Sequence, residues 1–228
     1  MLQNLLRKIN RWERNLHRAF GTDITDPRER SRSRWHYLLF DHGFLRTFWT
    51  NFDQVAPGVY RSNQPDHKRL IKARDMGIVS VLNLRGQGKH ARYLFEAESC
   101  AALGLTLVDI KFDARKAPQR DILLQLLGAF DKIERPFLMH CKSGADRAGL
   151  ASALYLIDQE GMGVDAIREQ LSFKYLHLRK SKTGVLDQLL DDYATRNATD
   201  PIPIRDWIAT QYDETATQAS FDAKRDQR

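Results

Sequence analysis

The stretch PFLMHCKSGADRAGL, residues 136–150, organises the chain. It begins with a short apolar run of strand type, turns through small and polar residues, and continues into the helix-forming run LASALYLI at 150–157. A tight loop between a strand and a helix directs backbone N–H groups and the positive end of the helix dipole toward one point. The pattern therefore predicts an anion-binding loop.

Two side chains of this loop are candidates for a catalytic role. Cys141 stands at the end of the predicted strand, and Arg147 lies six residues later at the start of the helix. A helix N-terminus and a nearby cation favour the thiolate form of a cysteine, which is the nucleophilic form. The planar fork of an arginine and the loop N–H groups suit the oxygens of a phosphate. One loop therefore supplies a nucleophile and an oxyanion cradle.

The cysteine–arginine spacing alone is a weak signal, because arginine is common in this chain. Three further residues make the pattern more specific, namely His140 before the cysteine, Gly144 within the loop and Gly149 after the arginine. The alternative is a buried structural cysteine in an ordinary strand–helix turn. The full pattern favours the functional interpretation.

The composition predicts one enzyme-sized domain. A chain of 228 residues, 42% of them hydrophobic, accommodates one domain with extensions, given a usual domain size of about 150 residues. Its two cysteines, Cys100 and Cys141, do not suggest a disulfide framework and indicate a reducing compartment such as the cytoplasm. No apolar run approaches the roughly 18–20 residues that span a bilayer, and we expect no signal peptide.

Residues 1–51 form a predicted basic helical extension. The first 50 residues hold ten Lys/Arg and five Asp/Glu, which is +5 of the net charge of +7. Apolar residues recur at helical spacing over residues 1–20, with basic residues between them. Such a helix either lies on an anionic membrane surface or packs its apolar stripe against the adjoining domain. No nucleic-acid-binding signature accompanies the basic residues, so we expect no nucleic acid partner.

From residue 52 onward, strand-like and helical patterns alternate. The strand-like runs are 55–65 (a turn and a short edge strand), 78–84, 105–112 and 136–141, and the helical ones are 66–76, 91–103, 120–134 and 147–157. This alternation predicts an α/β fold with a central, mostly parallel sheet of four to five strands flanked by helices. Ligands bind beyond the carboxyl ends of such strands, so we expect loops 85–89, 113–118 and 141–147 to meet.

The pattern His-Cys-x5-Arg resembles the phosphate-binding loop of the cysteine-dependent tyrosine and dual-specificity phosphatases. VYRSNQP at 59–65 and GIVSVLNLR at 77–85 are similar to the opening of their compact, atypical members, and the resemblance covers residues 52–195 of the predicted catalytic domain, 52–196. It implies hydrolysis of phosphate monoesters through a cysteinyl-phosphate, without metal or cofactor. By this resemblance Cys141 is the nucleophile and Arg147 holds the phosphate. The other expected phosphate-binding positions are Lys142, Ser143, Gly144, Ala145 and Asp146.

The resemblance also implies an aspartic acid on a neighbouring loop that protonates the leaving oxygen. Asp113 follows a strand end, where its loop can close over the cradle, whereas Asp109 lies four residues earlier within the strand. We expect Asp113 to be the general acid, with Asp109 as the alternative. Arg115 on the same loop is a candidate substrate contact, or else a solvated surface arginine.

One position departs from the family pattern. The residue after the loop arginine usually carries a hydroxyl that steadies the thiolate in the second step, but here it is Ala148. A catalytically weak phosphate-binding scaffold is therefore an alternative function. A sulfurtransferase-like loop is disfavoured, because it does not require Arg147 as a clamp. Lys142 resembles the lipid-phosphate members, so phosphotyrosine, an inositol phosphate and a phospholipid headgroup all remain candidate substrates.

The remaining chain carries weaker signals. Residues 163–172 and 183–196 are predicted helices, and between them His177 and Arg179 could reach the site, although a packed histidine and a solvated arginine are favoured. Residues 197–228 form a C-terminal extension with one helix near 201–208. Its polar tail, from residue 213 onward, is predicted to be disordered.

Overall fold

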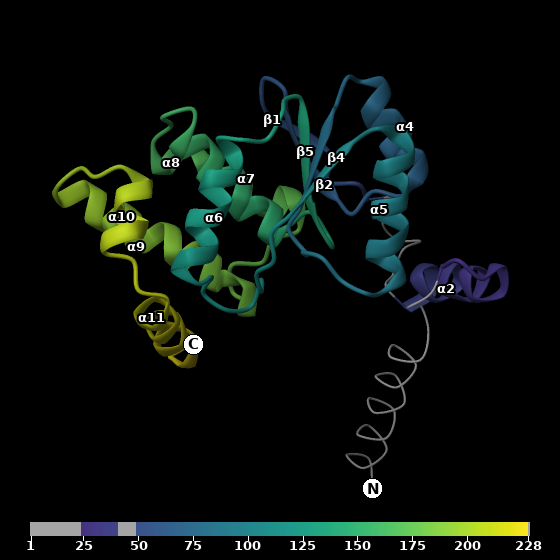
Figure 1. Cartoon of the computed structure of the whole chain (residues 1–228). Helices are drawn as coiled ribbons and strands as arrows, with labels where there is room; N and C mark the ends of the chain where they lie inside the picture. The colour runs from purple at the N-terminus through teal and green to yellow at the C-terminus, as the bar shows by residue number, and fades with distance from the viewer. Residues whose placement is uncertain (1–23, 41–48, 228) are drawn as a thin grey trace, which may run out of the picture.

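The computed structural model of the protein describes residues 24–40 and 49–227. Its centre is a five-stranded sheet in the order β1-β2-β5-β3-β4 (Figure 1). The strands are β1 (Asp53–Ala56), β2 (Val59–Asn63), β3 (Ser80–Asn83), β4 (Thr106–Asp109) and β5 (Phe137–Cys141). β1 pairs antiparallel with β2, and the other pairs are parallel. The predicted mostly parallel sheet is confirmed.

The prediction of one short edge strand within residues 55–65 is wrong. The chain forms a hairpin there, in which β1 takes the edge and β2 pairs with β5 inside the sheet. Gly58 lies in the turn with φ +74°, a conformation that other residues rarely adopt. The interior position of β2 matters for the site, because it aligns Asn63 with Cys141.

Helices cover both faces of the sheet (Figure 1). They are α4 (His67–Asp75), α5 (Ala91–Leu103), α6 (Arg120–Phe130) and α7 (Asp146–Asp158). Successive strand residues point to opposite faces. Val81 of β3 accordingly packs with Leu70 of α4 and Cys100 of α5, whereas Leu82 joins the main core, to which α6 and α7 contribute. The predicted flanking of the sheet by helices is confirmed.

The parallel strands end at the same edge of the sheet. In the register of the ladder, Asn63 lies opposite Cys141, and Asn83 lies between His140 and Asp109. The loops after β2, β3, β4 and β5 therefore leave from one level. This edge is where a ligand site is expected in a parallel sheet.

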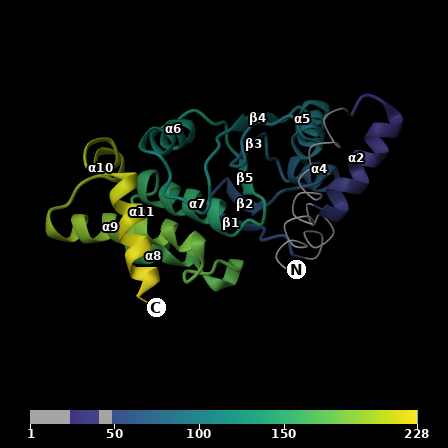
Figure 2. The same cartoon turned by 90° about the horizontal axis from the view of Figure 1, so that it is seen from below.

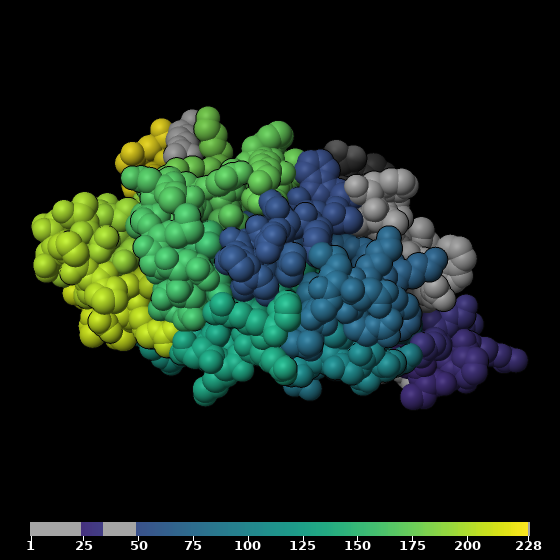
Figure 3. All heavy atoms as spheres, turned by 90° about the horizontal axis from the view of Figure 1, so that it is seen from above, coloured from purple at the N-terminus to yellow at the C-terminus, as the bar shows by residue number. Residues whose placement is uncertain are grey.

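The chain after α7 forms further helices. They are α8 (Val164–Ile167), the 3₁₀ turns η1 (Arg168–Leu171), η2 (Phe173–Tyr175) and η3 (Lys182–Gly184), and α9 (Val185–Thr199), α10 (Ile204–Thr210) and α11 (Glu214–Asp226). Trp207 of α10 is buried in the main core beside Tyr193 of α9. Figure 3 shows the C-terminal helices, in yellow, at one end of the molecule.

The prediction of disorder from residue 213 onward is wrong. The Asp213 carboxylate accepts hydrogen bonds from the N–H groups of Thr215 at 2.8 Å and Ala216 at 3.0 Å, which caps the start of α11. Phe221 of α11 is buried in the main core. This polar segment therefore forms a helix, which is stabilised by the Asp213 cap and by the packing of Phe221.

α2 (Pro27–Phe40) lies against α5, at the end of the molecule opposite the C-terminal helices (Figure 3). Arg30 forms an exposed ion pair with Glu98 at 2.6 Å, and its guanidinium lies 5.3 Å from the centre of the Phe95 ring. The amphipathic helix predicted over residues 1–20 lies outside the described residues. Within 24–40 and 49–227, no helix is both long and apolar enough to cross a membrane.

Candidate active site

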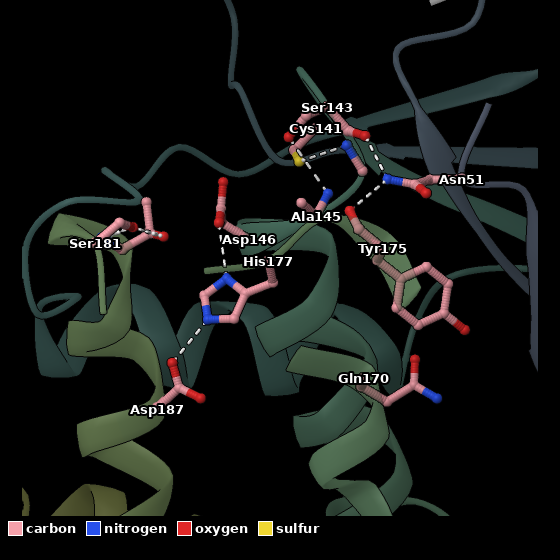
Figure 4. Close-up of polar contacts among 12 residues, drawn as sticks. Asn51, Cys141, Ser143, Ala145, Asp146, Gln170, Tyr175, His177, Ser181 and Asp187 are labelled. Carbon is pink, nitrogen blue, oxygen red and sulfur yellow. Dashed lines mark hydrogen bonds and ion pairs between the residues drawn. The ribbon is translucent and has the colours of Figure 1, made fainter. Parts of the chain in front are cut away.

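The candidate nucleophile Cys141 is the last residue of β5, and its side chain is buried. The alternation along β5 directs Cys141 into the main core and His140 toward Glu96 of α5 on the other face. The Gly144 N–H donates a hydrogen bond to Cys141 Sγ at 3.3 Å (Figure 4). The loop of residues 141–147 therefore curls back over the sulfur, as a cradle around a nucleophile requires.

Gly144 is the tightest point of this loop. Its φ is +75°, and a Cβ there would lie 2.6 Å from the Asn63 nitrogen and 2.7 Å from the Ser62 carbonyl carbon. Both atoms belong to the backbone of β2, which cannot move aside without disturbing the sheet. Position 144 therefore requires glycine, and this close approach seats the loop on the end of β2.

Arg61 of β2 is fully buried beneath the loop. Its Nη2 donates to the carbonyl oxygens of Gly144 at 2.6 Å and Ala145 at 3.3 Å. Its Nη1 donates to the backbone and side-chain oxygens of Gln170 at 2.9 and 2.7 Å, and the guanidinium lies 3.6 Å from the centre of the Tyr175 ring. Burial lowers the pKa of Arg61 to about 10, so the side chain remains charged at neutral pH.

The contacts of Arg61 orient the loop peptides. The C=O and N–H groups of a trans peptide point in opposite directions. Because Arg61 holds the Gly144 and Ala145 carbonyls, the N–H groups of residues 145 and 146 are turned to the other side of the loop. Successive N–H groups on one side make an anion-binding concavity. This role of Arg61 was not predicted from the sequence, where its only signal is an arginine inside a strand pattern.

Asn51 braces the loop from the N-terminal side of β1. It adopts φ 48°, a conformation that asparagine tolerates better than most residues. Its Nδ2 donates to the carbonyl oxygens of Ser143 at 2.8 Å and Tyr175 at 2.9 Å (Figure 4). It thus ties the loop to the segment that follows α8. No pattern in the sequence marked this residue.

Asp146, at the start of α7, contacts a buried histidine (Figure 4). His177 Nδ1 lies 2.8 Å from Asp146 Oδ1, and its Nε2 lies 2.7 Å from Asp187 Oδ2 of α9. Burial alone lowers the pKa of His177, but the hydrogen bonds and charges of the two carboxylates outweigh it and raise the pKa to about 9. His177 is therefore an imidazolium at neutral pH. The sequence favoured a packed histidine, and the structure adds its link to the loop.

Arg147 lies in the first turn of α7 and is half-buried. Its Nη1 lies 3.4 Å from the Leu84 carbonyl oxygen in the loop after β3. Its buried Nε has no hydrogen-bond partner among the residues that the structure describes. A buried donor without a partner is rare in folded proteins and indicates a place for an acceptor.

The residue that follows Arg147 is not a serine or threonine. Ala148 is fully buried at that position. Ser143 is exposed, and its Oγ accepts a hydrogen bond from the Ala145 N–H at 3.4 Å. Lys142 is half-buried, and its carbonyl oxygen accepts from the Gln64 N–H at 3.4 Å.

A buried polar network lies behind the strand ends. His140 Nε2 lies 2.5 Å from Glu96 Oε1, and both side chains are inaccessible to solvent or nearly so. Gln64 Nε2 donates to Glu96 Oε2 at 3.2 Å, and Arg85 Nη1 donates to Gln64 Oε1. These contacts join β5, α5 and the loops after β2 and β3. They tie together the edge of the sheet that carries the loop.

The two candidate acids differ in their contacts. Both oxygens of Asp109, the last residue of β4, accept hydrogen bonds, one from Asn83 Nδ2 and one from the Tyr93 hydroxyl, each at 2.8 Å. Asp113 is exposed, and its Oδ1 accepts from the Arg115 N–H at 2.9 Å. Within the described residues, neither Asp113 nor Arg115 forms a hydrogen bond or ion pair with loop 141–147. Their catalytic roles stay predictions.

Comparison with known proteins extends these observations. The dual specificity protein phosphatase 26 of Homo sapiens is 27% identical over 119 residues, which cover 49% of this chain and 54% of that protein. The chain thus spans about half the length of the curated relatives it matches.

Two solved structures share the fold. TpbA of P. aeruginosa has a TM-score of 0.50 at 16% identity, over 76% of this chain and 91% of that chain. The core catalytic domain of the PP-IP phosphatase SIW14 from S. cerevisiae has a TM-score of 0.50 at 18% identity, over 67% of this chain and 95% of that chain.

The family comparison covers more than half of the chain. The model of the DSP-PTPase phosphatase domain of Swiss Army Knife proteins (PTP-SAK) matches residues 50–182. This span contains the whole sheet and loop 141–147. Within this span Cys141 ends β5 and Arg147 lies in the first turn of α7, on either side of the loop. The chain therefore belongs to the PTP-SAK family of DSP-PTPase phosphatase domains.

Proposed function

We propose that this protein hydrolyses phosphate monoesters through a cysteinyl-phosphate intermediate. The observation that carries the proposal is the buried Nε of Arg147, which lacks a hydrogen-bond partner among the described residues. A phosphate oxygen bound in loop 141–147 supplies the acceptor, because a guanidinium pairs with phosphate through parallel N–H···O bonds. Membership of a phosphatase family over residues 50–182 supports the same activity.

In the first step the Cys141 sulfur attacks phosphorus from the side opposite the leaving oxygen. The S–P bond forms while the bond from phosphorus to the leaving oxygen breaks. Arg147 and the N–H groups of residues 142–147 stabilise the charge that develops on the other three oxygens. Asp113 donates its proton to the leaving oxygen, which departs as an alcohol or phenol.

In the second step a water molecule attacks the phosphorus of the intermediate. Asp113, now a carboxylate, accepts a proton from this water. The S–P bond breaks, and inorganic phosphate leaves with the thiolate of Cys141 restored. Neither step requires a metal ion or an organic cofactor.

The substrate and the cellular site are parts of the same proposal. Phosphotyrosine, inositol phosphates and phospholipid headgroups are the three substrate classes, and phosphate release from one member of each ranks them. We place the protein in the cytoplasm, because its two free cysteines and a thiolate nucleophile suit a reducing compartment. Residues 52–196 are the catalytic domain between extensions 1–51 and 197–228, and residues 1–20 either pack against this domain or contact an anionic membrane.

A second candidate function is a phosphate-binding scaffold with slow turnover. The observation that favours it is the fully buried Ala148, which provides no hydroxyl at the position where the family has one. Phosphate capture needs only the N–H groups and Arg147, whereas release of the thiolate in the second step lacks this stabilisation. A scaffold would bind phosphate analogues normally while releasing almost no phosphate.

Hydrolysis of p-nitrophenyl phosphate tests both candidates. The enzyme should show steady turnover in EDTA that vanadate inhibits, and Cys141→Ser should abolish turnover but still bind phosphate analogues that form no bond to sulfur. Arg147→Lys should weaken both, because an ammonium cannot replace the fork. If the wild type binds vanadate but releases no phosphate, the result would support the scaffold function instead. Turnover by Cys141→Ser above a few per cent of wild type would exclude Cys141 as the nucleophile.

A further inference from the structure

Three large apolar side chains are exposed on one short segment between α8 and α9. Phe173 is 70% exposed, Leu176 42% and Leu178 53%. We name these three residues the apolar rim. In Figure 2 the green stretch that follows α8 extends to the edge of the molecule. Large apolar side chains exposed close together in one segment suggest an interaction surface.

The residues between them hold this segment against the site. The Tyr175 hydroxyl donates to Asp53 Oδ2 at 2.6 Å, and His177 contacts Asp146 of the loop at 2.8 Å. Tyr175 and His177 are 3% exposed, so buried anchors alternate with the exposed residues of the rim. The apolar rim therefore projects because its neighbours are fixed, and it lies beside loop 141–147.

The backbone of the rim is strained. Leu176 adopts φ 61°, which is rare and energetically unfavourable for a bulky residue. Asn51, the other non-glycine residue with positive φ among those described, donates to the Tyr175 carbonyl oxygen next to it. Strained residues cluster at functional sites, because the surrounding structure must hold them in place. At Leu176 the surrounding structure holds an apolar side chain exposed to solvent.

Basic residues surround the apolar rim. They are Lys174, Arg179, Lys180 and Lys182, all exposed. The acidic groups that face them are Asp53 and Glu169, each 3.0 Å from Lys174 Nζ, and Asp191, which pairs with Arg179. Neither Lys180 nor Lys182 has a carboxylate within 4.0 Å among the described residues. The side of the segment toward α9 is therefore open to an anionic partner.

We propose that the apolar rim inserts into the interface of an anionic lipid bilayer while Lys180 and Lys182 contact the lipid headgroups. Apolar side chains that project on a cationic segment suit a bilayer surface, which accepts them without a preformed groove. His177 contacts Asp146 directly, and Asn51 joins the Tyr175 carbonyl to that of Ser143. Because these contacts fix the segment to the loop, insertion brings the phosphate-binding loop to the membrane. This contact is independent of residues 1–20 and does not require turnover.

Co-sedimentation of the full chain with vesicles tests the proposal. The vesicles contain phosphatidylcholine with or without about 30% phosphatidylserine, which sets the negative surface potential. Phe173→Ser/Leu178→Ser should weaken binding to the anionic vesicles about tenfold or more, because each side chain loses its apolar burial. The matched control is Met76→Ser/Met162→Ser, which removes two side chains of 50% and 38% exposure elsewhere and should bind as the wild type does.

A second variant tests the contribution of Lys180 and Lys182. Lys180→Gln/Lys182→Gln should weaken binding to the anionic vesicles and reduce its salt dependence, with no effect on phosphatidylcholine alone. The proposal fails if the wild type ignores anionic vesicles at low salt, or if Phe173→Ser/Leu178→Ser binds them undiminished. A fall of several degrees in the Tm of that variant also overturns it, because the apolar rim would then be packed against this chain.

Discussion

Arg61 Nη2 donates a hydrogen bond to the Gly144 carbonyl oxygen at 2.6 Å, from a side chain that is fully buried within the sheet. A charged donor thus holds the loop peptides from below while their N–H groups point to the opposite side. The conformation of the loop therefore depends on a buried side chain beneath it. We expect Arg61 to act as a positioning residue.

Arg61→Met should lower the free energy of unfolding by about 1.5–3 kcal/mol, the usual contribution of a hydrogen bond from a charged group. It should also weaken vanadate binding at a temperature where the variant is folded, because the loop carbonyls lose their donor. Arg74→Met is the control, since Arg74 pairs with Asp75 on the surface at 2.8 Å. Tight vanadate binding by folded Arg61→Met would contradict the positioning role.

Asp113→Asn should reduce hydrolysis of alkyl phosphates far more than that of p-nitrophenyl phosphate, whose leaving group departs without a proton. General-acid assistance contributes about 10²–10⁴-fold in rate. Asp109→Asn should instead lower Tm and affect both substrates alike, because it loosens the hydrogen bonds to Asn83 and Tyr93. The opposite ranking of the two variants would assign the acid to Asp109.

Ala148→Ser should raise the steady-state rate by roughly tenfold, the effect of one hydrogen bond of about 1.4 kcal/mol to the departing thiolate. In the wild type, rapid-mixing kinetics should show a burst of p-nitrophenol before a slow steady state, since the second step limits turnover. Ala151→Ser, one turn further along α7, is the control. Absence of a burst in the wild type, with an unchanged rate in Ala148→Ser, would show that the missing hydroxyl is immaterial.

The contribution of His177 to stability should depend on pH. Its pKa rises from 6.5 to about 9 on folding, because Asp146 and Asp187 outweigh the effect of burial. The folded state therefore binds this proton more tightly than the unfolded state does. The resulting stabilisation, at most about 3 kcal/mol, is fully present below pH 6.5 and is lost as pH rises to about 9.

Urea unfolding between pH 6 and pH 9.5 measures this effect. The difference in stability between the wild type and His177→Gln should be largest at the acid end of this range and shrink toward pH 9. His67→Gln is the matched control, because it removes an exposed imidazole at the start of α4. A difference that stays constant with pH would mean that His177 is neutral in the fold.

The sequence by itself determined the strand, loop and helix around Cys141 and the mostly parallel sheet. These are local properties: an apolar run, a glycine, and a helix-forming stretch that follows at once. The family motif added Arg147, and helical boundaries such as 91–103 agree with the structure. Local composition gave a wrong prediction of disorder for residues 213–226. This capped helix buries a single aromatic residue, Phe221, and so has the composition of a polar tail.

Only the tertiary structure decided which distant residues hold the loop. Arg61 and Gly144 are 83 positions apart, and Asn51 and Ser143 are 92 apart. A strand pattern states that a side chain is buried but does not name its partner. A buried guanidinium is stable only where several acceptors surround it. Those acceptors are loop carbonyls and Gln170. Their positions follow from the packing of β2, β5 and η1, and the sequence around Arg61 does not specify them.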